Sequence, residues 1–240
     1  MECRFDKDMI IPLSLCDNEG RLSVHSIFTI FMDLAAEHAE HIEVGADKMA
    51  QKGMFWLTAK TKIHINKRPQ MMSRVQASTW PEAPGRVRCN RFYSLREGND
   101  IYAEGITEWA IIDVNTGKLC KASDVYISGT VFSDKKVDVE AFEKIAEDFL
   151  PEQKLGVYRI SSSDIDLGQH MNNAAYVRAL LGAVKCSELQ SITDAEVVFR
   201  IPCFEGDELS IYRKNTDSGF DMAMLLPDGK AAILARFKTK

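Results

Sequence analysis

Apolar positions along the chain switch between a helical spacing and an extended one. Residues 24–42 carry apolar residues at helical spacing directly after Ser23, a residue type that caps helix starts. A short strand is predicted before this helix, at 9–15, and a short helix after it, at 46–51. Four segments rich in β-branched and aromatic residues follow, at 54–66, 73–81, 86–97 and 101–113. A helix followed by an antiparallel meander predicts an α+β domain whose sheet wraps the helix.

The second half of the chain repeats this order. A strand is predicted at 156–161, a turn at 164–170 and a helix at 173–188, and four strands follow at 194–203, 207–215, 219–226 and 230–238. Between the halves, Gly129, a charged run, an amphipathic segment at 139–150 and Pro151 indicate a connecting stretch with a short helix. The pattern therefore predicts an N-terminal domain at 1–128, a linker at 129–155 and a C-terminal domain at 156–240.

The composition excludes several classes of protein. The formal net charge is −5 and no recognised nucleic-acid-binding motif occurs, which disfavours a nucleic-acid partner. No uninterrupted run of about 18 apolar residues occurs and the N-terminus is charged, so we expect a cytoplasmic protein without membrane insertion. The six cysteines are scattered, with no Cys-x-x-Cys and no Cys/His pair at zinc-ligand spacing, so we expect reduced thiols and no metal.

The charge is unevenly distributed along the chain. From Lys60 to Arg96 there are nine basic residues against one acidic residue, Glu82. Such a stretch can attract an acidic partner to one part of an acidic protein. The alternative interpretation is a set of solvated strand faces, and the sequence leaves both open.

The segment at 163–176, Ser-Asp-Ile-Asp-Leu-Gly-Gln-His-Met-Asn-Asn-Ala-Ala-Tyr, carries the chain's candidate chemistry. It lies where a strand is predicted to end and a helix to begin, and a helix start offers unpaired N–H groups to a developing oxyanion. Gly168 permits a close backbone approach or a positive φ, while Asn172 or Asn173 can cap the helix. Asp166 or His170 can then polarise a water molecule against a carbonyl group bound beside the helix start. The alternative is a plain Asp/Gly turn with an asparagine cap and an incidental histidine.

Aligning the two halves shows that only the second carries this group of polar residues. The alignment pairs Asp17 with Asp166, Arg21 with His170, and Ser23 with Asn172. Since sequence identity between the halves is slight, the predicted repeat concerns the order of elements, while the candidate chemistry belongs to the second copy alone.

The pattern Asp-x-Asp-x-x-Gln-His-x-Asn-Asn-x-x-Tyr at 164–176 closely resembles the signature of the second hotdog domain in plant plastid and bacterial acyl-acyl-carrier-protein thioesterases. The first half agrees independently. Residues 56–69 resemble that family's long central strand, and residues 75–80 resemble the Thr-Trp strand after it. Residues 113–119 with Ala122-Ser123 resemble a later hairpin, so the resemblance covers roughly residues 10–205.

The resemblance implies a tandem (double) hotdog fold, in which an antiparallel sheet wraps each long helix. It also implies hydrolysis of a long-chain acyl thioester carried by phosphopantetheine on acyl carrier protein, without a cofactor, by a monomer or homodimer. The N-terminal hotdog would hold much of the acyl chain and the C-terminal one would supply the reactive groups. By position, Asp166 and His170 match the family's catalytic residues. Cys203 falls near a cysteine once proposed as the family's nucleophile, but no base or positive dipole is identified beside it.

Two positions depart from the family's pattern. The family usually has a catalytic asparagine where this chain has Gly168, and the plant enzymes have a glutamate where it has Pro202. Proline cannot act as a base, which leaves Glu205 as the nearby carboxylate able to stand in. These departures keep a non-catalytic acyl-binding protein open as an alternative. An acyl-CoA thioesterase of the same fold is a second alternative, although the basic stretch favours the acidic carrier protein.

Overall fold

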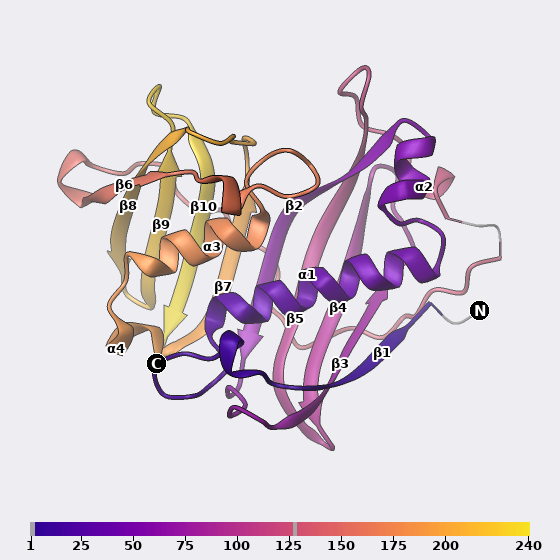
Figure 1. Cartoon of the computed structure of the whole chain (residues 1–240), viewed down its shortest axis with the longest axis horizontal. Helices are drawn as coiled ribbons and strands as arrows, with labels where there is room; N and C mark the ends of the chain where they lie inside the picture. Colours follow the sequence, from indigo (N-terminus) through magenta and orange to yellow (C-terminus); the bar gives the residue numbers. More distant parts are fainter. Residues whose placement is uncertain (1–2, 127–128) are drawn as a thin grey trace. The chain divides into compact units, whose positions relative to one another are not determined.

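The computed structural model describes residues 3–126 and 129–240 (Figure 1). The chain divides into two compact units, Met1–Val139 and Glu140–Lys240. The elements of the N-terminal unit are β1 (Phe5–Ile10), η1 (Leu13–Leu15), α1 (Val24–His41), α2 (Ala46–Gln51), β2 (Met54–Ile65), β3 (Arg74–Pro81), β4 (Arg88–Glu97), β5 (Asp100–Asp113) and η2 (Ala122–Asp124). Its strands pair antiparallel in the order β1-β3-β4-β5-β2.

The C-terminal unit repeats this topology. Its elements are η3 (Pro151–Gln153), β6 (Lys154–Arg159), η4 (Ser162–Asp164), α3 (Asn173–Gly182), α4 (Cys186–Leu189), β7 (Ile192–Phe199), β8 (Glu208–Thr216), β9 (Gly219–Leu225) and β10 (Ala231–Thr239). Its strands pair antiparallel in the order β6-β8-β9-β10-β7, which matches the first unit strand for strand. The predicted α+β class and the predicted repeat of elements are therefore confirmed.

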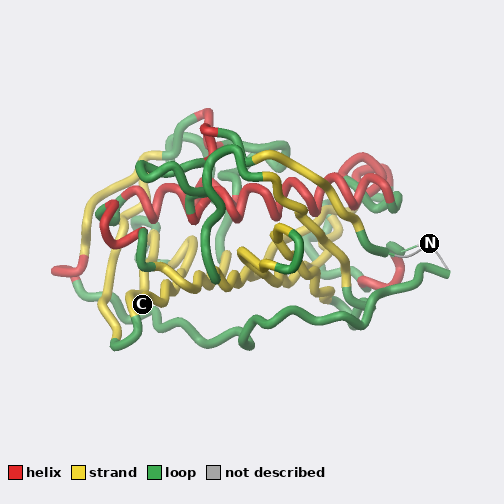
Figure 2. Tube along the Cα trace, turned by 90° about the horizontal axis from the view of Figure 1, so that it is seen from below, coloured by secondary structure: helices red, strands yellow, loops and turns green. Residues whose placement is uncertain are grey.

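In the N-terminal unit, the long helix α1 lies against one face of its sheet (Figure 2). The residues predicted for its apolar face are all buried: Ile27, Phe28, Phe31, Leu34 and Ala35. Phe31 passes so close to Gly105 of β5 that a Cβ at that glycine would lie 2.8 Å from Cε2 of the ring. A glycine is therefore needed there for the helix to approach the sheet.

The second long helix is shorter than its sequence pattern predicts. The predicted helix at 173–188 ends at Gly182, and a separate turn of helix follows as α4. Glycine in a helix interior costs about 0.5–1 kcal/mol relative to alanine, which explains the break. The predicted apolar residues of α3 are nevertheless buried: Tyr176, Val177, Leu180 and Leu181.

The structure differs from the sequence-based expectation in two further places. The first strand spans Phe5–Ile10 rather than 9–15, because Pro12 cannot donate to a ladder and η1 begins directly after it. Residues 139–150 contain no helix. Instead Ile145 is buried against Leu234 of β10, and the backbone N–H of Glu143 donates to Glu196 at 2.9 Å. The amphipathic segment thus covers the sheet as an extended strap.

Candidate active site

The candidate segment forms a tight loop between β6 and α3. The backbone N–H of Asp166 donates to the carbonyl of His170 at 3.1 Å, and the N–H of Gln169 donates to the carbonyl of Asp166 at 3.0 Å. An isolated bridge between Ile165 and Met171 closes the base of the loop. The loop therefore joins the backbones of Asp166 and His170 near the start of the helix, and both residues are only partly buried.

The Asp166 carboxylate is held by two neutral donors. Its Oδ1 accepts the backbone N–H of Gly168 at 2.8 Å, and its Oδ2 accepts Nδ2 of Asn172 at 3.1 Å. In the described part of the chain Asp166 makes no ion pair. A carboxylate accepts about four hydrogen bonds, so this one keeps lone pairs with which to bind a water molecule.

The imidazole of His170 has a defined tautomer. Its Nδ1 lies 3.2 Å from the carbonyl oxygen of Met171. A carbonyl only accepts hydrogen bonds, so Nδ1 carries a proton, and in the neutral form of the ring the lone pair is on Nε2. The ring can therefore accept a proton at Nε2, as a general base requires.

Asn172 joins the helix start to the carboxylate. It is the N-cap of α3, and its Oδ1 accepts the N–H of Ala174 at 2.8 Å while its Nδ2 donates to Asp166. Asn173 is the first residue of the helix. The sequence predicted a cap at one of these two asparagines, but the bond from Asn172 to Asp166 could not be read from spacing.

The left-handed residue of the loop is Gln169, with φ of 60°, next to the predicted position Gly168. In the first copy the equivalent residue is Gly20, with φ of 71°. A side chain in this conformation costs of the order of 1–3 kcal/mol, and such strain gathers at functional sites. Gly168 contributes its backbone N–H to Asp166 instead.

The other carboxylate of the motif, Asp164, serves the structure. It is only 1% exposed and accepts hydrogen bonds from Ser161 N, Ser161 Oγ, Tyr158 Oη and Arg178 Nη2, at 2.7–3.0 Å. Burial raises its pKa, but these hydrogen bonds and the charge of Arg178 outweigh burial and leave the pKa below its ordinary value. With every oxygen engaged, Asp164 anchors the loop and is not available to a substrate.

Cys203 has a structural role. Its side chain is fully buried, its backbone N–H donates to Oη of Tyr176 at 3.1 Å, and its carbonyl accepts the N–H of Met171 at 2.8 Å. Burial raises the pKa of the thiol, and the charge of Asp207 adds to this, although a hydrogen bond with Tyr176 opposes it. A nucleophilic thiolate is disfavoured, since the hydrogen bond with Tyr176 does not offset burial and the pKa of the thiol stays above its ordinary value. Pro202 and Glu205 on either side are exposed.

The equivalent loop of the first copy has the same backbone but a different chemical environment. Asp17 N–H donates to the Arg21 carbonyl at 2.8 Å, as Asp166 does to His170. Asp17, however, forms an ion pair with Arg68, whose side chain is 5% exposed. The backbone and side-chain hydrogen bonds and the charge of Arg68 outweigh burial and lower the Asp17 pKa. The aspartate of the first loop is therefore held in an ion pair with an arginine. The aspartate of the second loop, Asp166, has neutral donors and keeps lone pairs that can bind a water molecule.

The basic stretch at 60–96 does not form a continuous charged surface. Lys62 and Arg91 are buried, at 1% and 6% exposure, and Arg68 is committed to Asp17. Arg88 pairs with Glu108 on the neighbouring strand. Alternate residues of a strand point to opposite faces, so the stretch is divided between the interior and the surface. The exposed basic residues of this stretch fit the interpretation as solvated strand faces. The stretch does not form a surface that would attract an acidic partner.

Across residues 3–126 and 129–240, the His, Cys, Asp and Glu side chains form no group that could hold a metal ion. Within the same residues, no helix is long and apolar enough to cross a membrane.

The fold and the loop define an α+β protein of two hotdog units, with a carboxylate and an imidazole at the start of the second long helix. Residues 2–129 match the family model of the acyl-ACP thioesterase N-terminal domain, and residues 149–238 match that of the C-terminal domain. The chain belongs to the acyl-ACP thioesterase family.

Individual relatives are distant. The chain is 24% identical over 194 residues to the chloroplastic oleoyl-acyl carrier protein thioesterase of Coriandrum sativum, covering 71% of this chain and 52% of that one. It thus spans about half the length of the curated relatives it matches. Among solved structures, an acyl-ACP thioesterase from Bacteroides thetaiotaomicron superposes with a TM-score of 0.87 at 18% identity, over 99% and 98% of the two chains. The 12:0-ACP thioesterase from Umbellularia californica gives 0.81 at 15% identity, over 99% and 97%. These superpositions show the double hotdog fold.

Proposed function

We propose that this chain hydrolyses acyl-acyl-carrier-protein thioesters, releasing a free fatty acid and the carrier protein. Family membership supports this reaction, and the relatives from Coriandrum sativum and Umbellularia californica are named for it. The observation that carries the proposal is that one loop holds an oriented carboxylate, Asp166, and an imidazole, His170, on two residues joined by a backbone hydrogen bond.

In the proposed mechanism, Asp166 and His170 act on one water molecule. Asp166 orients the water, and the proton that the water loses passes to His170 Nε2 as its oxygen attacks the thioester carbonyl carbon. The carbonyl oxygen becomes negative and is stabilised at the start of α3, where the N–H of Asn173 faces no partner earlier in the helix. When the C–S bond breaks, the imidazolium returns the proton to the departing sulfur, so the products are a carboxylic acid and a thiol.

The test is thiol release from acyl-acyl carrier protein by purified variants. Asp166→Ala and His170→Ala should each lower kcat by at least about a hundredfold, the range of general acid–base contributions. Arg21→Ala is the matched control, because Arg21 occupies the place of His170 in the first copy. Turnover at the wild-type rate by both active-loop variants would eliminate the mechanism.

The nature of the thiol carrier needs its own experiment. The family match favours the carrier protein over CoA, while the divided basic stretch removes one reason for that preference. Comparing kcat/KM for the two thioesters at low and moderate salt separates them, because steered association of two charged proteins weakens as salt rises. An inactive acyl-binding protein would release no thiol from either thioester despite tight binding.

A further inference from the structure

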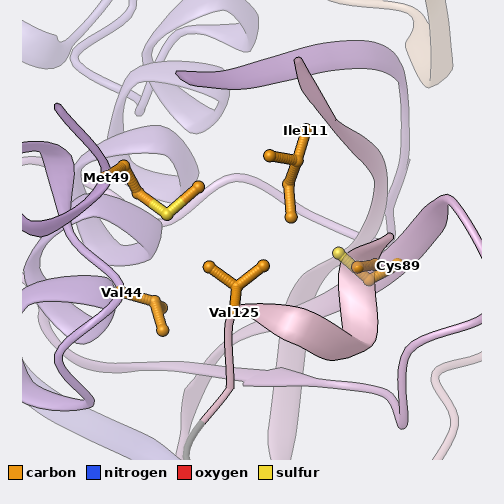
Figure 3. Packing of buried hydrophobic residues seen from close by; sticks show 6 residues of the cluster. Val44, Met49, Cys89, Ile111 and Val125 are labelled. Atoms are coloured by element: carbon orange, nitrogen blue, oxygen red, sulfur yellow. The ribbon is translucent and has the colours of Figure 1, made fainter. Parts of the chain in front are cut away.

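Three residues other than glycine have a positive φ in the described part of the chain: Glu43, Met72 and Gln169. This conformation strains a residue that has a Cβ, and strain that packing does not explain points to function. Glu43 has a packing explanation. It directly follows the C-cap of α1, and the next residue, Val44, is buried in an apolar cluster with Met49 (Figure 3). Gln169, in contrast, lies in the candidate active loop.

The first copy shows that the backbone of this loop does not need a glutamine. The N–H of Gly20 donates to the carbonyl of Asp17 at 3.0 Å, as the N–H of Gln169 donates to that of Asp166 at 3.0 Å. The φ values are 71° at Gly20 and 60° at Gln169, so the two residues have the same conformation. Glycine adopts it without strain, and the glutamine side chain therefore lowers the stability of the second loop.

The side chain of Gln169 is available to a ligand. The residue is exposed, and its carboxamide makes no hydrogen bond to any residue of 3–126 or 129–240. It directly precedes His170, and its backbone is bonded to Asp166. The active loop thus presents a carboxamide at the position where the first loop presents no side chain at all.

The chemistry of a carboxamide limits what it can bind. It offers a donor, the NH₂ group, and an acceptor, the carbonyl oxygen. In the proposed substrate the acyl chain has neither, and the thioester carbonyl oxygen is assigned to the N–H groups at the start of α3. The phosphopantetheine arm remains. Its first amide is separated from the sulfur by an ethylene group, and this amide has one N–H and one carbonyl, which match the two ends of a carboxamide.

We propose that Gln169 binds the amide of the phosphopantetheine arm that lies nearest to the thioester sulfur. This contact holds the sulfur end of the substrate beside the loop that carries Asp166 and His170. The inference rests on the proposed thioesterase function and adds a substrate-binding residue to it. Because the arm does not change during the attack on the carbonyl carbon, loss of the contact should raise KM and leave kcat unchanged.

The experiment compares thioesters of one acyl group with three thiols: the acyl carrier protein, N-acetylcysteamine and propanethiol. N-acetylcysteamine carries the first amide of the arm, and propanethiol lacks it. Gln169→Met keeps the length of the side chain and the left-handed backbone but removes the carboxamide. It should raise KM about tenfold for the first two thioesters, which corresponds to about 1.4 kcal/mol. For the propanethiol thioester, kcat/KM should equal that of the wild type.

Two glycine variants separate recognition from backbone strain. Gln169→Gly should show the same rise in KM together with a higher thermal midpoint, because it also relieves the left-handed side chain. Met72→Gly is the matched control. Met72 has a φ of 66° where the second copy has Gly206 with a φ of 88°, and their N–H groups donate to the carbonyls of Ile11 and Ile160. The control should raise the thermal midpoint and leave KM unchanged for all three thioesters.

Three outcomes for Gln169→Met contradict the inference. An equal loss with and without the amide would show a change in the loop itself. Wild-type KM for every thioester would show that the carboxamide contacts no substrate. A loss confined to the carrier-protein thioester would assign Gln169 to the surface of the carrier protein rather than to the arm.

Failure of the inference is distinguishable from failure of the proposed function. If the wild-type chain hydrolyses none of the thioesters, the proposed function is wrong, and calorimetric titration with the thioether S-octylpantetheine, which cannot be hydrolysed, still decides the inference. Binding about tenfold weaker by Gln169→Met than by the wild type supports the contact with the arm. Equal Kd values, or no binding by either protein, refute it.

Discussion

The bond from Asn172 to Asp166 gives the sharpest test of how the loop is built. Asn172 has two separate duties, since its Oδ1 caps α3 at Ala174 and its Nδ2 donates to Asp166. Asn172→Ser keeps an oxygen that can cap the helix but removes the amide nitrogen Nδ2, which reaches the carboxylate. Asn172→Ala removes both. The pair of variants therefore separates the stability of the helix from the orientation of the Asp166 carboxylate.

The expected losses of activity and stability in the two variants follow from the type of hydrogen bond that each variant loses. A hydrogen bond to a charged group contributes about 1.5–3 kcal/mol. If that bond positions Asp166 for attack, its loss lowers kcat/KM by roughly 10- to 150-fold in both variants, at about 1.4 kcal/mol per factor of ten. Loss of the cap costs about 0.5–2 kcal/mol of folding free energy, and this cost applies mainly to the alanine variant. A loss of about 1 kcal/mol lowers the thermal midpoint by about 2–4 °C in a chain of this size.

The assay measures thiol release under kcat/KM conditions together with thermal unfolding followed by circular dichroism. The expected outcome is that both variants lose activity while only Asn172→Ala loses several degrees of stability. Ser23→Ala at the start of α1 is the matched control, since it alters a helix start in the first copy and should leave turnover intact. Wild-type kcat/KM in Asn172→Ser would refute the positioning of Asp166 by this side chain.

Three further outcomes are expected. Cys203→Ala should keep kcat within about threefold of wild type, because a buried thiol with a raised pKa supplies little thiolate; a loss of hundreds-fold in the thiol-release assay would restore the cysteine as nucleophile. The folded pKa of Asp164 lies below its ordinary value, so its contribution to stability is present above about pH 4 and is lost as pH falls through the folded pKa. Asp164→Asn should therefore flatten this part of the curve of unfolding free energy against pH. Gln169→Gly should raise the unfolding free energy measured in urea by about 0.5–1 kcal/mol by relieving a left-handed side chain, whereas Gly20→Ala should lower it by about 1 kcal/mol.

Most of the fold could be predicted because its elements have strong periodic signals. The apolar spacing of α1 and the β-rich segments of the meander gave element types and order, and Ile27 and Phe31 are buried as expected. The segment at 139–150 failed for a tertiary reason. Its amphipathic pattern suits a helix, but Ile145 and Glu143 instead find partners on the sheet, and those contacts override local preference.

The sequence identified the residues of the candidate site, but it could not show which of them are held by structural hydrogen bonds and which keep free lone pairs. The sequence shows two carboxylates in the motif, Asp164 and Asp166. Only the structure shows that Tyr158, Ser161 and Arg178 occupy the oxygens of Asp164. These donors lie up to 14 residues away in the sequence, so no local sequence pattern predicts them. The positive φ at Gln169 could not be predicted from the sequence either. The neighbouring Gly168 is the residue type that usually adopts this conformation.

The internal repeat also gives Pro202 a meaning that the family pattern alone does not. Leu22 donates to the carbonyl of Pro69 as Met171 donates to that of Cys203, so Arg68 and Pro202 occupy equivalent places. In the first copy that place supplies the guanidinium that pairs with the loop aspartate and lowers its pKa. A proline there can supply no charge, which leaves the aspartate of the second loop to neutral donors that orient it without cancelling its charge. Pro202, which kept a non-catalytic protein open as an alternative, is therefore compatible with the proposed role of Asp166 as an active carboxylate.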